Sequence, residues 1–354
     1  MNNKELKIPP HYNSDKVKEV WRVEYENIAI MAGNWAQEHK LSPVSQDEPR
    51  ICLVLVDVQN TFCIPGFELF VGGSSGLAAV DDNIRLSEFI YRNLHNITQI
   101  FPTMDTHQAM HIFHGIFFLD EKGDHPKPYT QITSDDIKNK RWRFNQDLVQ
   151  NLQSDPNYIE KHLLHYTQEL EKSGKYELTI WPYHAMLGGI GHALVSSIEE
   201  AVFFHSIARS SQPFIYVKGD HPLTEHYSVL RPEVITTHEG TTLGARNQAL
   251  FEKSTNLDHI YKKLLDFDAL IIAGQAKSHC IAWTISDLLK LIRSDDENLA
   301  EKIYILQDCT SPIVVPGEID FTEHANQAFK EFADAGMHIV QSTEPLCDWP
   351  GICN

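Results

Sequence analysis

Short, almost uninterrupted apolar runs alternate along this chain with longer segments whose apolar residues recur at helical spacing. Runs such as residues 51–56 and 269–273 have no polar side, so strands made from them are buried on both faces. The alternation therefore predicts a doubly wound α/β fold, in which helices cover both faces of a mostly parallel six-stranded sheet. The expected strands are residues 51–56, 97–104, 214–218, 269–273, 303–307 and 338–341. The expected helices are residues 14–39, 81–93, 134–151, 157–172, 191–206, 242–253 and 281–293.

Regions at both ends and one in the middle lie outside this alternation. Residues 1–48 predict an N-terminal helical extension, and residues 346–354 predict a C-terminal tail. Between them, residues 49–345 predict one α/β domain with a polar insertion at residues 113–178. Because the insertion joins two segments that carry candidate site residues, we expect it to act as a lid or an oligomer contact.

Composition narrows the partners of the chain. Its 354 residues carry a net charge of −18 and no basic stripe, which argues against nucleic acid and anionic membranes. No stretch approaches the roughly 18 apolar residues of a membrane span, and the first residues lack the apolar core of a signal peptide. The six cysteines show no paired framework, as expected for reduced thiols. We therefore expect a cytoplasmic protein that acts on a small molecule, with a homo-oligomer as an open alternative to a monomer.

Three reactive side chains follow directly on the ends of predicted strands. Asp57 comes after the first strand, Lys218 closes the third, and Cys280 opens the helix that follows the fourth. The carboxyl ends of parallel strands lie at one edge of a sheet, so these residues are expected to converge there. Each taken singly is more often structural: a buried cysteine, a turn cap and a solvated strand end.

Together the three side chains suit acyl transfer. A carboxylate can take the thiol proton, an ammonium favours the thiolate, and the protonated carboxyl can return its proton to a leaving amine. Backbone N–H groups at the start of the following helix can hold an oxyanion. The predicted activity is a cysteine-dependent amidase that works through a thioester.

A second group of residues has the donor types of a metal site. Asp105 and His107 follow the second strand, separated by one residue, and His184 lies much later, behind Trp181 and Pro182. One carboxylate and two imidazoles form a divalent-metal set, with zinc expected and iron or manganese as alternatives. The chain contains 19 histidines, so most are expected to be solvated or structural. His111, His114 and His125 are placed in that class, with His125 kept as the competing ligand.

These segments resemble the isochorismatase-like cysteine hydrolases. Residues 57–62 are similar to the Asp-x-Gln-x-x-Phe opening of that superfamily, and residues 274–280 resemble its nucleophile turn. The resemblance extends over about residues 50–112 and 178–345. It implies a cis peptide bond between Gln275 and Ala276.

Two segments resemble the metal-binding nicotinamidase branch in particular, namely residues 105–107 and 181–189. This resemblance implies that Asp105, His107 and His184 bind the metal, which holds the pyridine nitrogen of nicotinamide or a nearby water. It also implies a substrate pocket. The residues expected to contact the substrate are Phe62, Trp181, Gln275 and Ala276.

The chain also departs from the nicotinamidase pattern. Thr106 stands where that branch has Trp, and Ala185 where it has Cys. The favoured function is hydrolysis of nicotinamide to nicotinate and ammonia. Two alternatives stay open: a metal-independent isochorismatase-like or carbamoyl-amide hydrolase, and a non-catalytic binding protein of the same fold.

Overall fold

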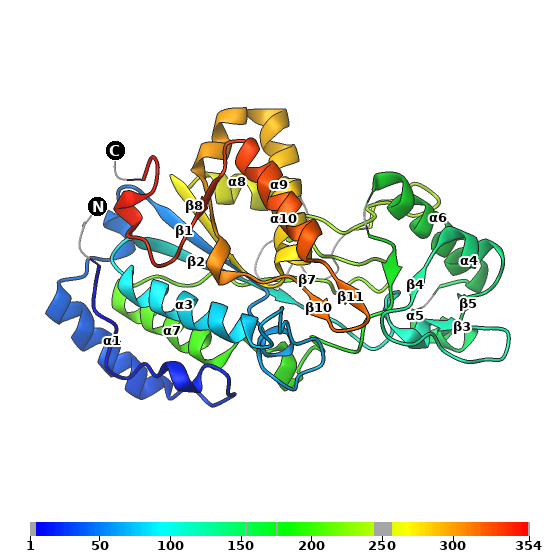
Figure 1. The fold of residues 1–354 in the computed structure, drawn as a ribbon, viewed down its shortest axis with the longest axis horizontal. Helices are drawn as coiled ribbons and strands as arrows, with labels where there is room; N and C mark the ends of the chain where they lie inside the picture. Colours follow the sequence, from blue (N-terminus) through cyan, green and yellow to red (C-terminus); the bar gives the residue numbers. More distant parts are fainter. Residues whose placement is uncertain (1–4, 153, 175, 244–256, 353–354) are drawn as a thin grey trace.

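A six-stranded sheet forms the centre of the computed structural model, which describes residues 5–152, 154–174, 176–243 and 257–352. All neighbouring strands of this sheet are parallel, in the order β12-β9-β8-β1-β2-β7 (Figure 1). The strands are β1 (Ile51–Val56), β2 (Ile97–Asp105), β7 (Tyr216–Lys218), β8 (Ala269–Gly274), β9 (Ile303–Leu306) and β12 (His338–Val340). The predicted fold class and all six predicted strands are confirmed.

Helices cover both faces of the sheet, because β1 directs alternate side chains into two cores (Figure 1). Leu53 and Leu55 belong to the core under α3 and α7, whereas Val54 and Val56 belong to the core under α8, α9 and α10. Helix α1 packs on the outside of α7. The helices are α1 (Tyr25–His39), α2 (Asn60–Cys63), α3 (Ala78–Arg92), α7 (Ser196–Arg209), α8 (Leu257–Leu265), α9 (Ala282–Asp295) and α10 (Thr322–Asp334).

The predicted helices differ from the structure in several places. The N-terminal helix begins only at Tyr25, and residues 14–16 form a separate 3-10 turn. Helix α10 and helix α8 were not among the predicted elements. Most of the helix predicted at residues 242–253 lies outside the described residues. No helix among the described residues is long and apolar enough to span a membrane.

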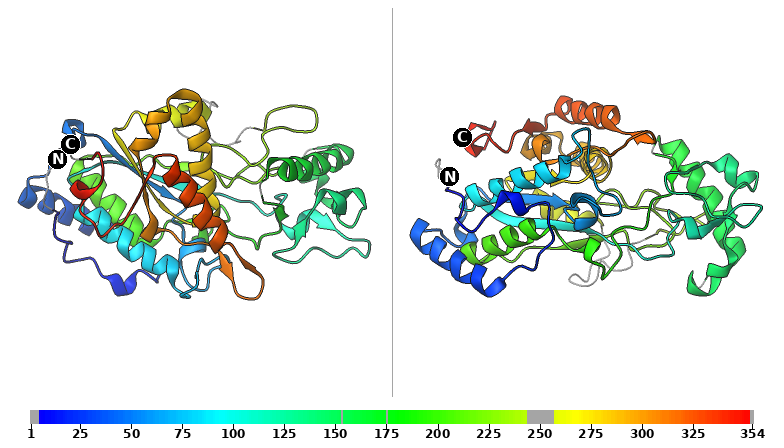
Figure 2. Two further views of the ribbon diagram at one scale, coloured as in Figure 1. Left: turned by 45° about the horizontal axis from the view of Figure 1, so that its top comes forward. Right: turned by 60° about the horizontal axis from the view of Figure 1, so that its bottom comes forward.

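The insertion forms a lobe beside the sheet, at the end where the strands finish (Figures 1 and 2). Its elements are β3 (Phe118–Leu119), β4 (Gln131–Ile132), α4 (Ser134–Lys138), β5 (Arg143–Phe144), α5 (Val149–Leu152), α6 (Pro156–Ser173) and β6 (Leu178–Thr179). The single helix predicted over residues 134–151 is therefore wrong, because Lys140 has a left-handed backbone (φ 57°) and a short strand interrupts the segment. A hairpin of β10 (Val314–Val315) and β11 (Ile319–Asp320) lies at the same end of the sheet, on the side that faces the lobe (Figure 1).

The lobe is tied to the main domain by polar contacts. Tyr176 donates to the carbonyl oxygen of Ser278, 2.9 Å away, in the turn that carries the candidate nucleophile. On α6, His162 Nε2 lies 2.8 Å from the carbonyl oxygen of Leu223. The division of the chain into extension, domain, insertion and tail remains a prediction, as does the role of the insertion as a lid or oligomer contact.

Candidate active site

Four neighbouring strands end at the candidate site. Asp105 and Lys218 are the last residues of β2 and β7 and pair with each other in the strand register. Asp57 follows β1, and Cys280 follows β8 after a short turn. The chain leaves β1 toward β2 and β7 but builds β8, β9 and β12 on the opposite side. The site therefore lies where the strand order reverses, which is the usual ligand position in a doubly wound sheet.

Lys218 holds the reactive groups together. Its Nζ lies 2.8 Å from Asp57 Oδ2, 3.0 Å from Asp105 Oδ1 and 3.7 Å from Cys280 Sγ. It also donates to the carbonyl oxygen of His226 at 2.9 Å. The side chain is completely buried. The structure thus brings the three predicted catalytic residues together, with Asp105 as a fourth member.

Special backbone conformations at Asp57 and Gly274 fix the position of the Asp57 carboxylate and of the turn that leads to Cys280. Asp57 has φ 49°, and Thr103 Oγ1 both accepts from its N–H at 3.1 Å and donates to its Oδ1 at 2.6 Å. Gly274 has φ 120°, and a Cβ there would lie 2.1 Å from the Val56 carbonyl oxygen, so only glycine fits. The peptide bond between Gln275 and Ala276 is cis, as the resemblance implies.

Electrostatics favour a protonated thiol in the free protein. Burial raises the pKa of Cys280 well above its usual value; the Lys218 ammonium opposes this, and the charges of Asp57 and Asp105 add to it. Burial also raises the pKa of Asp57, although Lys218 lowers it in part. The pKa of Lys218 is well above its usual value, because Asp105 and Asp57 outweigh its burial. The sequence-based expectation that the ammonium favours a thiolate omitted the second carboxylate and the burial of the thiol.

The nucleophile turn adds no charge to the site. Cys280 lies in the π-helical turn Lys277–Ile281 that leads into α9. Lys277 points to α10, where its Nζ donates to Asn326 Oδ1 at 2.9 Å. Burial lowers the pKa of His279 to about 3, so this ring is neutral near pH 7.

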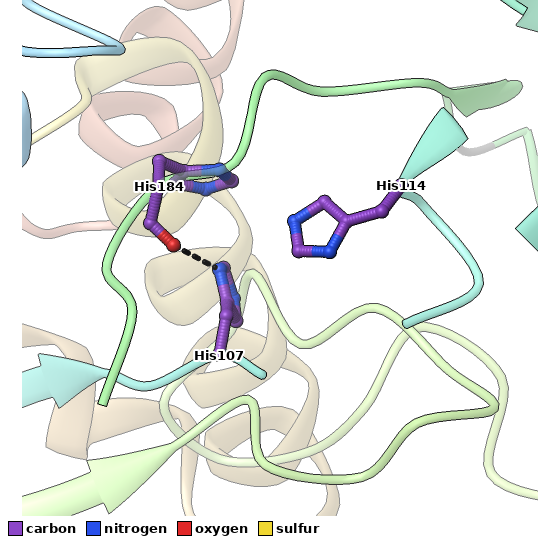
Figure 3. Close-up of side chains that lie close together, drawn as sticks. All are labelled: His107, His114 and His184. Carbon is purple, nitrogen blue, oxygen red and sulfur yellow. Dashed lines mark hydrogen bonds between the residues drawn. The ribbon is translucent and has the colours of Figure 1, made fainter. Parts of the chain in front are cut away.

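Three buried imidazoles beside this group form a candidate metal centre. His107, His114 and His184 offer ligand atoms that all lie within 4.8 Å of one another (Figure 3). In each ring Nδ1 faces a backbone carbonyl oxygen, at 3.1 Å (His184), 3.1 Å (Ala109) and 2.7 Å (Pro182) respectively. A carbonyl only accepts, so in His114 and His184 Nδ1 carries the proton and Nε2 keeps the lone pair that a metal needs. Burial lowers the pKa of His114 to about 3 and that of His184 well below its usual value, which keeps these rings neutral.

Asp105 lies next to this centre rather than within the three-histidine group. Its Oδ1 is 3.1 Å from His107 Nε2, and its Oδ2 is 3.9 Å from His184 Nε2. Burial acts to raise the pKa of Asp105, but His107 and Lys218 hold it well below its usual value. The carboxylate is therefore ionised and links the metal centre to the lysine.

The structure places His114, expected among the solvated or structural histidines, beside His107 and His184. Its Nε2 is buried and has no partner among the described residues. In contrast, His125 Nδ1 lies 2.6 Å from the Phe118 carbonyl oxygen, and the residue is not part of the described cluster. The only sequence signal was that His107 and His114 share one loop after β2.

The predicted substrate residues lie in different surroundings. The ring of Phe62 is 5.6 Å from that of His184, and the ring of Trp181 is 5.5 Å from that of His279. The Gln275 side chain donates to Asp82 at 2.8 Å and accepts from the Ser311 N–H at 3.3 Å, and its backbone N–H donates to the Val56 carbonyl oxygen at 2.8 Å, so neither its side chain nor its N–H is free for a substrate. Ala276 is buried beside it.

The thiols give a mixed result. Cys52, Cys63, Cys280 and Cys309 are free and buried, as expected for reduced cysteines. Cys347 is disulfide-bonded, so the expectation fails at that residue.

Among known proteins, no protein-family model and no curated protein matches the chain. A nicotinamidase–pyrazinamidase structure from Acinetobacter aligns over 84% of this chain and 99% of its own, at 20% identity and a TM-score of 0.47. A yeast nicotinamidase bound to the inhibitor nicotinaldehyde aligns over 82% of this chain and 99% of its own, at 20% identity and a TM-score of 0.48. The Pyrococcus horikoshii pyrazinamidase in complex with zinc aligns over 83% of this chain and 99% of its own, at 18% identity and a TM-score of 0.42. All three TM-scores are below 0.5, so these similarities establish no function for this chain.

Proposed function

We propose that this protein is a cysteine-dependent amidohydrolase of the isochorismatase-like type that converts nicotinamide to nicotinate and ammonia. The observation that supports the proposal best is the contact of Lys218 with Asp57, Asp105 and Cys280 at the carboxyl edge of the sheet. The buried histidine cluster next to it favours the nicotinamidase branch over metal-independent relatives.

In the proposed reaction Asp57 is the proton carrier. It takes the proton of Cys280 as the sulfur attacks the amide carbonyl, and it returns this proton to the nitrogen of the leaving ammonia. Asp57 then removes a proton from water, whose oxygen attacks the thioester; the carbon–sulfur bond breaks, the acid leaves, and Asp57 returns the proton to the Cys280 sulfur. Lys218 stabilises the thiolate and the ionised Asp57 during these transfers. The raised pKa of Asp57 suits this role, because a stronger base accepts the thiol proton more readily.

A divalent ion would be held by His107, His114 and His184 with Asp105 beside them. The three imidazoles and the adjacent carboxylate fit zinc, and iron or manganese would accept the same donors. A bound ion would supply a Lewis-acidic anchor for the ring end of the substrate. The chain's own contribution is to bury the three rings and, through this burial, to lower the pKa of His114 and His184 so that these two stay neutral.

The proposal is tested by ammonia release from nicotinamide, pyrazinamide and aliphatic amides, with zinc supplied. We expect turnover of a pyridine carboxamide that Cys280→Ala abolishes. Cys52→Ala is the matched control, since it removes another buried thiol but leaves the site intact. Hydrolysis of aliphatic amides only would refute nicotinamide as substrate. Activity that survives chelators would favour a metal-independent hydrolase. No turnover of any amide would favour a binding protein.

A cytoplasmic location and a homo-oligomeric state are further proposals.

A further inference from the structure

Glu225 is a buried carboxyl group that the proposed reaction does not use. It lies seven residues after Lys218, in the segment that follows β7, and is 2% exposed. Tyr227 donates to its Oε1 at 2.6 Å, and Tyr166 donates to its Oε2 at 3.0 Å. Tyr166 belongs to α6 of the insertion, so Glu225 joins the insertion to the main domain.

Both tyrosine hydroxyls donate to the Glu225 carboxylate, and each also accepts a hydrogen bond from an N–H group. The indole Nε1–H of Trp181 donates to the Tyr227 oxygen at 2.8 Å, and the N–H of Glu225 donates to the Tyr166 oxygen at 2.9 Å. Each hydroxyl therefore already accepts one hydrogen bond and directs its own proton to the carboxylate. An indole can only donate, so the position of Trp181 depends on the Tyr227 oxygen, and that oxygen is fixed by Glu225.

Trp181 connects the two halves of the candidate active site. Its backbone forms a bridge with His114 of the metal centre, and it lies three residues before His184. On the other side, its ring lies 5.5 Å from the ring of His279, the residue before Cys280. The ring of Tyr227 is 5.2 Å from that of His279. A change in the angle of the indole would alter the space between the nucleophile turn and the histidines.

We propose that Glu225 is a positioning residue that sets the preference of the site for flat aromatic amides, because it holds Tyr227 and, through it, the indole of Trp181. The inference rests on the proposed amidase function. Without the Glu225 carboxylate, the Tyr227 hydroxyl is no longer held in place as the acceptor of the Trp181 indole N–H. A buried N–H without an acceptor is unfavourable, so the indole ring is expected to rotate. An aromatic substrate that stacks on this ring loses its binding surface, whereas a small aliphatic amide depends on it less.

The protonation state of Glu225 sets the conditions of the test. Burial raises its pKa to about 8, although the hydroxyls of Tyr227 and Tyr166 lower it. Assays at about pH 9 therefore examine the carboxylate form, in which both oxygens accept.

The experiment compares Glu225→Gln and Tyr227→Phe with Tyr91→Phe, which removes another buried hydroxyl, on α3. Steady-state kinetics are measured for nicotinamide and for an aliphatic amide. The Trp181 indole N–H signal is followed by NMR and assigned with Trp181→Phe. We expect the KM for nicotinamide to rise about tenfold in both test variants, with a smaller change in kcat and in the aliphatic reaction. The indole signal is expected to move in both, and Tyr91→Phe is expected to change neither reading.

Unchanged selectivity together with an unchanged indole signal in Glu225→Gln and Tyr227→Phe would overturn the inference. If Glu225→Gln does not fold, Tyr227→Phe carries the test, since it removes only the hydroxyl between Glu225 and the indole. If the wild-type protein turns over no amide, the proposed function fails, and nicotinamide binding followed through the indole signal decides instead. Weaker binding in the two variants then supports the positioning role, and equal binding refutes it.

Discussion

Gly219 gives the sharpest test of the link between the lysine and the metal centre. Its backbone has φ 84°, and a Cβ at this position would lie 2.5 Å from Asp105 Oδ1 and 3.1 Å from His107 Nε2. Ordinary contact begins at about 3.4 Å, so Gly219→Ala must displace the carboxylate oxygen by about 0.9 Å. That oxygen lies 3.0 Å from Lys218 Nζ and 3.1 Å from His107 Nε2, and both contacts are lost or stretched by such a shift.

The expected effect on metal binding is large, whereas that on stability is small. The clash reaches Asp105 Oδ1 and His107 Nε2 themselves, so we expect zinc affinity to fall by at least the roughly 10- to 100-fold that loss of a supporting group around a metal ligand typically costs. A left-handed alanine costs about 1–2 kcal/mol. For 354 residues, an unfolding entropy of roughly 2 cal/mol/K per residue converts this cost into a Tm lower by about 1–3 °C.

The matched control is Gly123→Ala. Gly123 has φ 88° and nothing within 4 Å of the added Cβ, so it carries the same backbone cost without the clash. Zinc affinity is measured by competition with a chromophoric chelator, and Tm by calorimetry. Equal zinc affinity in the two variants would refute the reasoning, because only Gly219→Ala brings a Cβ against Asp105 and His107.

Three further predictions concern the nucleophile, the ligands and a buried histidine. Cys280→Ala should abolish turnover yet bind zinc as the wild type does, as measured by metal content; loss of the metal would show that the thiol is a ligand. His114→Ala should release the metal and His125→Ala should not, and the reverse result would restore the competing assignment. Burial lowers the pKa of His205 from 6.5 to about 4, so the unfolded chain binds more protons between these values. The neutral ring thus contributes about 3 kcal/mol above pH 6.5 that is lost as the pH falls toward 4. The free energy of unfolding of His205→Gln, measured with denaturant from pH 7 to 4, should therefore fall less with decreasing pH than that of the wild type.

Much of the candidate site could be predicted because it consists of strand ends. Asp57, Lys218 and Asp105 follow apolar runs that are recognisable in the sequence, and parallel strands deliver their carboxyl ends to one edge whatever the loops do. Cys280 was found for the same reason, one turn beyond β8. The order of the strands then made these four residues neighbours.

The parts that could not be predicted depend on loops and on distant partners. The ring of His114 reaches the metal centre only because its loop bends back from β2, and nothing in the spacing of histidines distinguishes it from His125. Thr103 on β2 donates a hydrogen bond to Asp57 at the end of the neighbouring strand β1. This contact can be predicted only if the pairing register of β1 and β2 is known. Glu225 meets Tyr166 only after the insertion has folded onto the segment behind β7.

The sequence alone determined the class of fold and the chemical types at the sheet edge, because buried strands and the residues at their ends are encoded locally. Tertiary structure decided the protonation state of Cys280, which depends on burial and on two carboxylates rather than on the nearby lysine alone. It also decided which histidines form the cluster and what holds Trp181. These properties depend on distances of 3–5 Å between residues far apart in the chain, which only the packed structure sets.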